Sequence, residues 1–215
     1  MNYSKNKIFG NWDFYKLCIS VAVPVMAQQL IMGMVSLIDN FMVAGLGDTK
    51  MAAVNVANQL NFIYLVLLYT FYGAGGIYMA QNSGADNQEG MQQAFRFKVI
   101  LPFIISVIYM ILMLINPEIF MRLLTQGNHA QKEILESSSK YMKIIAFTFI
   151  PISISGAIGS SYREIGKPHI PLIISVIATA CNTFGNWILI YGNLGAPKLE
   201  ETGAAIATLI ARILE

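Results

Sequence analysis

Five long runs without a charged residue recur along the chain, and each is large enough to cross a membrane. They are Leu17–Ile38, Met51–Ala85, Val99–Pro117, Ile144–Tyr162 and Ile170–Pro197. A bilayer core about 30 Å thick needs about 20 apolar residues in a helix. Only helices and closed barrels satisfy the backbone in lipid, and these runs are too long and too evenly apolar for barrel strands. The sequence therefore predicts an all-α membrane protein, a polytopic transmembrane helix bundle.

The runs and the breakers between them predict where the helices lie. We expect complete helices near residues 14–44, 52–82, 96–116, 142–162 and 169–191, and a partial sixth helix over 202–215. The stretch Glu118–Lys143 joins the third and fourth helices and is expected to hold an amphipathic helix. The first run is too long for a signal-peptide core and no cleavage pattern follows it, so it is expected to remain in place.

Composition excludes several classes of protein. Only 12% of the residues are charged, against about 25% in a typical soluble domain. The net charge of +2 and the lack of a basic cluster give no reason to expect a nucleic-acid partner. Cys18 and Cys181 should differ in height by roughly 15 Å in their helices, whereas a disulfide needs Cα atoms within about 7 Å. We therefore expect two free thiols and no cysteine-based metal site.

Flanking charges weakly predict the orientation. If the N-terminus is cytoplasmic, the inner side holds Lys5, Lys7, Lys16, Arg96, Lys98, Arg163 and Lys167, and the outer side holds Lys50, Arg122, Lys132, Lys140, Lys143 and Lys198. Cytoplasmic loops of membrane proteins carry an excess of Lys and Arg. Seven against six, with three lysines ahead of the first helix, favours a multi-pass protein of the cell (inner) membrane with a cytoplasmic N-terminus.

Asp39 is the one acidic residue within the five predicted complete spans. A charge inside the bilayer costs about 2.5–3.5 kcal/mol on insertion scales, which makes such a residue a functional candidate. The alternative is that Asp39 simply reaches water at the helix end. Asp39 lies five or six residues before the outer end of its helix, about 8 Å into the bilayer, and this depth favours a functional role.

Other helices place polar groups at a similar depth. Asn186 lies equally far from the outer end of the fifth helix, and Asn182 lies one turn deeper on the same face. Counting inward along the remaining helices gives Asn55, Thr148 and Thr208, with Asn58 and Gln59 a turn further, and Tyr109 on the third helix. We expect these residues to line a cavity around Asp39.

Such a cage can hold Na⁺, or a proton on Asp39, because carboxylate and carbonyl oxygens suit hard cations. We therefore expect a coupling ion, Na⁺ or H⁺, bound at Asp39, Asn182, Asn186 and Thr208, and no organic cofactor. The competing interpretation of each neutral group is an interhelical hydrogen bond worth about 0.6 kcal/mol. Pro24 removes a backbone hydrogen bond within the first helix, which predicts either a static kink or a point of bending.

Three segments resemble the multidrug and toxin extrusion (MATE) transporters. PVMAQQLIMGMVSLIDNFMVAGLGDTKMAAVNVANQ is similar to the opening of the family, with a proline and a glutamine ahead of an aspartate. GAGGIYMAQNSGADN resembles the second helix and inner loop. SSYREIGKPHIPLIISVIATACNTFGNWILIYGNLGAPKLEETGAAIATLIAR resembles the fourth loop, the fifth helix and the start of the sixth. The resemblance covers nearly the whole chain.

The resemblance implies the first of two six-helix lobes of a twelve-helix antiporter, with the C-terminal lobe as a missing partner. Such transporters export drugs and organic cations in exchange for Na⁺ or H⁺. The family's helix-one aspartate and bent-helix proline map onto Asp39 and Pro24, its paired helix-five positions onto Asn182 and Asn186, and a helix-six threonine onto Thr208. Many relatives have aspartate at the second helix-five position, so the asparagine here leaves one carboxylate and both coupling ions open.

Three alternatives to an antiporter remain. A flippase for lipid-linked glycans would need several basic residues in a central cavity, and the predicted spans contain essentially none. A membrane-embedded enzyme would need a Ser/His, Glu/His or metal constellation, which the spans lack, so we expect no enzyme. A non-transporting membrane subunit is excluded only by an activity assay.

Overall fold

The computed structural model describes residues 10–125 and 131–215, and these residues form helices and no strand. The helices are α1 (Trp12–Ala44), α2 (Asp48–Gly84), α3 (Gln88–Ile115), α4 (Pro117–Leu124), α5 (Gln131–Ile145), α6 (Phe149–Glu164), α7 (His169–Tyr191) and α8 (Glu200–Leu214). Short 3-10 turns lie at Ala146–Thr148, between α5 and α6, and at Asn193–Gly195. Lys5 and Lys7, used above for the orientation, lie outside the described residues.

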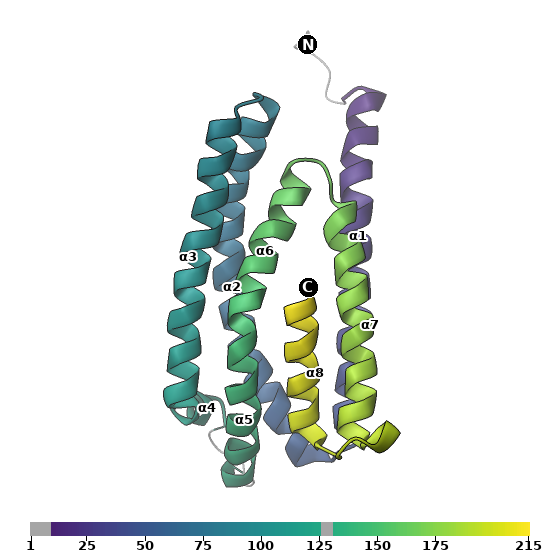
Figure 1. Ribbon diagram of the computed structural model, residues 1–215, viewed down its shortest axis with the longest axis vertical. Helices are drawn as coiled ribbons and strands as arrows, with labels where there is room; N and C mark the ends of the chain where they lie inside the picture. Colours follow the sequence, from purple (N-terminus) through teal and green to yellow (C-terminus); the bar gives the residue numbers. More distant parts are fainter. Residues whose placement is uncertain (1–9, 126–130) are drawn as a thin grey trace.

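Five helical segments are long and apolar enough to cross a membrane: α1, α2, α3, the continuous α5–α6 segment and α7. The predicted helical membrane fold with five complete spans is therefore confirmed. The sixth helix, α8, has 15 residues and ends about midway along the bundle (Figure 1).

The helices run up and down between two ends of an elongated bundle (Figure 1). The start of α1, the α2–α3 turn and the α6–α7 turn lie at one end, and the α1–α2 and α7–α8 connections lie at the other. α7 packs against α1 and α8, while α3 packs against α2 and α6. Loops therefore alternate between the ends as predicted, although which end is cytoplasmic stays a prediction.

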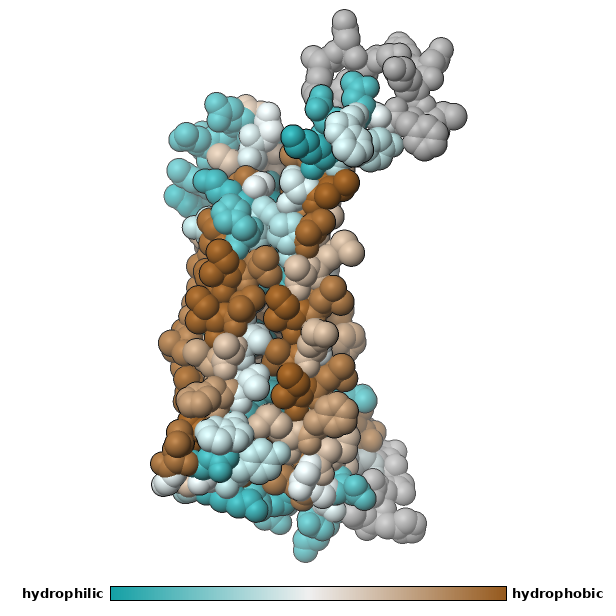
Figure 2. Space-filling view, turned by 90° about the vertical axis from the view of Figure 1, so that its right-hand side faces the viewer, coloured by the Kyte–Doolittle hydropathy of each residue, from teal (hydrophilic) through white to brown (hydrophobic). Residues whose placement is uncertain are grey.

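The bundle carries its apolar side chains outward as well as inward. Figure 2 shows an apolar belt across the middle of one face, with hydrophilic residues gathered at both ends. Large exposed residues such as Leu30, Met34 and Ile177 are scattered over α1 and α7. This pattern is what a bilayer requires, because lipid tails solvate apolar side chains and the polar ends meet water and headgroups.

The fourth span begins earlier than predicted, at Gln131 rather than near residue 142. Glu136 and Lys140 fall in the predicted connection Glu118–Lys143, and in the structure they occupy only the exposed face of α5. The opposite face buries Ile134, Leu135 and Met142, and this amphipathic pattern stabilises a helix by packing. The expected amphipathic helix also exists in α4, where Met121 is buried and Arg122 is exposed.

The two cysteines are free, as predicted, and both are exposed on the surface of α1 and α7.

Candidate cation site

Two helices bring Asp39 together with both predicted asparagines. Asp39 lies near the end of α1, and Asn182 and Asn186 lie one turn apart on α7. The amide nitrogen Nδ2 of Asn186 donates a hydrogen bond of 2.7 Å to Oδ1 of Asp39. Asn186 is only 2% exposed, so this charge-assisted hydrogen bond lies where water competes little for it.

Asn182 joins Asp39 to Thr208 on α8. With the Asn182 amide oriented so that both of its ends are satisfied, its nitrogen donates to Oδ2 of Asp39 at 3.0 Å. Its oxygen then accepts hydrogen bonds from the backbone N–H and the hydroxyl of Thr208, each at 3.2 Å. The structure thus brings together all four residues predicted to hold the coupling cation.

Small residues allow α8 to approach α7 closely enough for this contact. A side chain at Gly203 would collide with the backbone of Leu189, and a Cβ on Gly185 would lie 3.0 Å from the Cβ of Ala207. Small residues at helix interfaces permit close backbone approach inside membranes. The GAAIAT sequence at the start of α8 therefore fixes the distance between Thr208 and the α7 asparagines.

Among the described residues, two buried side-chain oxygens have no hydrogen-bond partner, Oδ1 of Asn61 on α2 and Oδ1 of Asn186, and the second lies at this site. The carbonyl oxygen Oδ1 of Asn186 is buried and accepts no hydrogen bond, although its own nitrogen is bound to Asp39. A buried acceptor without a partner costs about 1–3 kcal/mol. Amide carbonyl and carboxylate oxygens are ligands of hard cations, so a cation bound beside Asp39 would satisfy this atom.

The four residues line a central cavity of about 600 Å³ between α1, α2, α5, α7 and α8. Asn55, Asn58 and Thr148 line it too, as predicted from their depth. The Thr148 hydroxyl donates to the backbone carbonyl of Ile145 at 2.6 Å, so its oxygen keeps a lone pair for the cavity.

Two predicted lining residues lie elsewhere. Gln59 is exposed on another face of α2, and Tyr109 packs away from the cavity between α2 and α3. The Tyr109 ring stacks on Tyr64 at 5.2 Å, and its hydroxyl donates to the backbone carbonyl of Leu60. The prediction that these two residues line the cavity is therefore wrong, because depth along a helix does not set the direction in which a side chain points.

Pro24 does not line the cavity either, and α1 continues through it as one helix. One turn further along α1, Gln28 is buried and donates to the Ser175 hydroxyl of α7 at 2.6 Å. Its oxygen accepts from Arg163 of α6 at 3.4 Å. Pro24 thus lies beside a polar contact between α1, α6 and α7, and bending at Pro24 stays a prediction.

Sequence reasoning missed several polar lining residues. They are Gln29, Ser36, Asn40, Asn61, Tyr141, Ser175, Thr179, Arg212 and Glu215. On α1, Ser36 follows Gln29 by seven positions and precedes Asp39 by three and Asn40 by four, a helical spacing visible in the sequence. Tyr141 lay outside the predicted fourth span, and Arg212 and Glu215 lay in the partial sixth. The interpretation that essentially no basic residue lies in the spans is wrong, since Arg212 lines the cavity and Lys98 is fully buried in α3.

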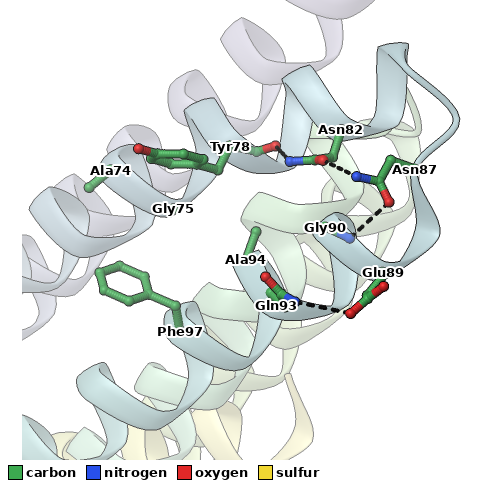
Figure 3. Close-up of a pocket in the computed structure, with 10 residues that line it drawn as sticks. All are labelled: Ala74, Gly75, Tyr78, Asn82, Asn87, Glu89, Gly90, Gln93, Ala94 and Phe97. Atoms are coloured by element: carbon green, nitrogen blue, oxygen red, sulfur yellow. Dashed lines mark hydrogen bonds between the residues drawn. The ribbon is translucent and has the colours of Figure 1, made fainter.

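A second cavity, of about 530 Å³, lies between α2 and α3 near their turn and contains none of the predicted residues. Figure 3 shows its polar side chains bonded to one another and to nearby backbone. Asn87 donates to Asn82 at 2.8 Å and accepts from the backbone of Gly90, and Gln93 donates to Glu89. These bonds close the turn, so we assign no ion to this groove.

Comparison with known proteins shows a family match over most of the chain. A family profile described as MatE matches residues 24–188. The probable multidrug resistance protein NorM of Thermotoga maritima is 25% identical over 202 residues, which are 94% of this chain and 43% of that protein. The protein of the same name from Photorhabdus laumondii is 26% identical over 203 residues, 94% of this chain and 44% of that protein.

Solved structures show the same fold. A transporter of the MOP superfamily from Pyrococcus furiosus, whose binding pocket is described as having reverse polarity, matches with a TM-score of 0.80 at 24% identity. An outward-facing multidrug resistance MATE family transporter matches with a TM-score of 0.78 at 25% identity. Each match covers 92% of this chain and 42% of the other. The chain thus spans less than half the length of its relatives, as expected for one lobe of two.

Proposed function

Because the chain belongs to the MatE family of multi-pass membrane transporters, we propose that it forms the N-terminal, cation-binding lobe of an antiporter. The antiporter exports drugs or organic cations across the cell membrane, driven by Na⁺ or H⁺ entering the cell. This is transport rather than catalysis. The names of the multidrug resistance relatives support the substrate class.

The unpartnered oxygen of Asn186 is the observation that carries the proposal. It is a buried carbonyl oxygen attached to an amide that already touches the Asp39 carboxylate. Thr208 adds a hydroxyl that donates to the Asn182 oxygen across the α7–α8 contact. A Na⁺ ion bound by Asp39 and Asn186, or a proton on Asp39, neutralises the one carboxylate that these asparagines surround.

An ion drives a conformational change only if the two states bind it with different affinities. Asp39 lies on α1, whereas Asn182 and Asn186 lie on α7 and Thr208 lies on α8. A cation held between them therefore ties α1 to the α7–α8 pair. Bending of α1 at Pro24 separates these ligands, so ion binding favours one state and ion release favours the other.

The proposal requires a second lobe. The chain covers 43% of the Thermotoga maritima relative, and the partner is a C-terminal lobe that completes the drug path between the two halves. In the proposed orientation the start of α1 and the α2–α3 turn face the cytoplasm. The cavity and Asp39 then lie in the outer half of the membrane.

A glycan flippase is less well supported than an antiporter. A lipid-linked glycan carries phosphates, which several arginines or lysines would have to neutralise. Among the described residues that line the central cavity, Arg212 supplies a positive charge and Glu215 is bonded to it. The net charge of this lining therefore favours cations.

The test uses the native protein that contains this chain, purified and reconstituted in liposomes with imposed Na⁺ or H⁺ gradients. Export of ethidium, a fluorescent organic cation, is followed in wild type and in Asp39→Asn, with Asp48→Asn as the control for an exposed carboxylate. We expect gradient-driven export to be lost only in Asp39→Asn, with normal membrane insertion. Wild-type export by Asp39→Asn refutes the coupling role.

A further inference from the structure

Two charged side chains at the end of α8, one in its last turn and one just after it, share the central cavity with Asp39. Arg212 lies one turn beyond Thr208, and both line the cavity together with Glu215. The Arg212 guanidinium donates to the Glu215 carboxylate at 2.5 Å. The titratable groups that line this cavity in the described residues are Asp39, Tyr141, Arg212 and Glu215.

We propose that Arg212 is a resident counter-charge of the cation site, which weakens cation binding at Asp39 and replaces the ion beside Asp39 after release. The inference rests on the proposed function, since it requires a cation at Asp39. It adds a residue that sets the affinity of the site without being one of its ligands.

Charge and position both support this role. Arg212 lines the same cavity as Asp39, and its guanidinium carries a fixed positive charge. This charge therefore opposes the binding of Na⁺ and H⁺ alike. Its long side chain borders the cavity that Asp39 also lines, so the guanidinium can reorient within that cavity from Glu215 toward Asp39.

A carboxylate surrounded by neutral amides in a low-dielectric cavity binds a cation strongly and releases it slowly. An antiporter has to release its coupling ion in every cycle. Arg212 meets this need by stabilising the ion-free form of Asp39, and Glu215 limits the effect by holding the guanidinium in the ion-bound form. Arg212 and Glu215 therefore act on ion affinity in opposite directions.

Because Arg212 and Glu215 act in opposite directions, their variants should change the ion affinity in opposite directions. Arg212→Gln removes the repulsion, and we expect it to lower the half-saturating Na⁺ concentration by on the order of tenfold, the size of one charge acting over about 10 Å at an effective dielectric constant near 20. Glu215→Gln frees the guanidinium for Asp39 and should raise that concentration several-fold. Arg212→Lys keeps the charge and should stay near wild type.

The experiment measures binding of radioactive Na⁺ to the native protein that contains this chain, with Arg122→Gln as the matched control. Arg122 is exposed on α4 and pairs with Glu118 outside the cavity, so its loss should leave binding unchanged. If wild type binds no Na⁺, the same variants are compared by the proton gradient that gives half-maximal ethidium export, with the same signs expected.

Two results overturn the inference. Unchanged affinity in Arg212→Gln, or shifts of the same sign in Arg212→Gln and Glu215→Gln, show that Arg212 does not act by charge on the site. If Arg212→Gln fails to insert into the membrane, the other two variants still test the inference. A wild-type ion affinity in Glu215→Gln refutes it, and so does a large change of ion affinity in Arg212→Lys. Loss of ion binding in Asp39→Asn with no shift in the α8 variants refutes this inference while leaving the proposed function intact.

Discussion

Removing Glu164 should destabilise the bundle more than removing any exposed acidic residue. Lys98 of α3 is fully buried, and its ammonium pairs with the Glu164 carboxylate at 2.5 Å. Gly75 and Gly76 on α2 make the space, because a side chain at these positions would collide with Lys98 and Glu164 respectively. Breaking a buried ion pair by removing one partner costs about 3–5 kcal/mol, since the remaining charge is uncompensated.

The structure places the expected cost of Glu164→Gln near the lower end of that range. The Ser161 hydroxyl stays 3.1 Å from the Lys98 ammonium and continues to accept one of its three hydrogens. We therefore expect the free energy of unfolding to fall by about 3 kcal/mol. The measurement is reversible unfolding of the purified protein in mixed micelles, followed by circular dichroism.

Two further variants make this reasoning refutable. The double variant Lys98→Met with Glu164→Leu removes both charges, and it should regain most of the lost stability because an apolar pair fills the same space. Glu118→Gln breaks an exposed pair with Arg122 and should cost less than about 1 kcal/mol. A Glu164→Gln variant as stable as Glu118→Gln, or a double variant less stable than Glu164→Gln, contradicts the account.

Three shorter predictions concern the site and the topology. Asn182→Ala and Asn186→Ala should each weaken ion binding roughly fivefold, because one neutral hydrogen-bonding group contributes about 1 kcal/mol. Complete loss of ion binding in either variant would contradict the smaller role assigned to the asparagines relative to the Asp39 carboxylate. Cysteines introduced at Asp48 and Asn87, both exposed and at opposite ends of α2, should be labelled from outside the cell only at Asp48 in a protein with its native cysteines replaced. Labelling from outside at Asn87 alone would show that the N-terminus is extracellular, opposite to the predicted orientation. The chain expressed without a second lobe should confer no drug resistance, and resistance from the chain by itself would show that one lobe suffices.

The spans and the height of the polar layer could be predicted from sequence because both follow from distances along a helix. Apolar length fixes where a helix crosses lipid, and a rise of about 1.5 Å per residue fixes how deep each polar group lies. Asp39 and Asn186 were placed at one height in this way, and their side chains meet at 2.7 Å. The family resemblance independently pointed to the same pair.

Rotation about the helix axis explains the errors. Gln59 and Asn58 are neighbours at nearly the same height, yet only Asn58 faces the cavity. Tyr109 faces Tyr64 and Phe149 in an aromatic cluster instead. Tertiary packing decides which face of a helix points inward. The depth of a residue along its helix does not reveal that face.

Charged residues gave a different kind of error. From the sequence, the α5 charges fall in the connection Glu118–Lys143 and Lys98 falls at the inner end of the third helix, because an isolated charge inside lipid is unfavourable. In the structure the α5 charges lie on its exposed face and Lys98 is neutralised by a partner 66 positions away. Such pairing depends on contacts between distant segments, so hydropathy along the chain does not reveal it.

Direct measurement of ion binding tests the central claim most closely. The purified protein that contains this chain is titrated with Na⁺ by calorimetry, and proton binding is followed in parallel, in wild type, Asp39→Asn and the exposed-carboxylate control Asp48→Asn. The account predicts one Na⁺ or one proton bound per chain in wild type and in Asp48→Asn, and none at this site in Asp39→Asn. Equal ion binding by wild type and Asp39→Asn would contradict it.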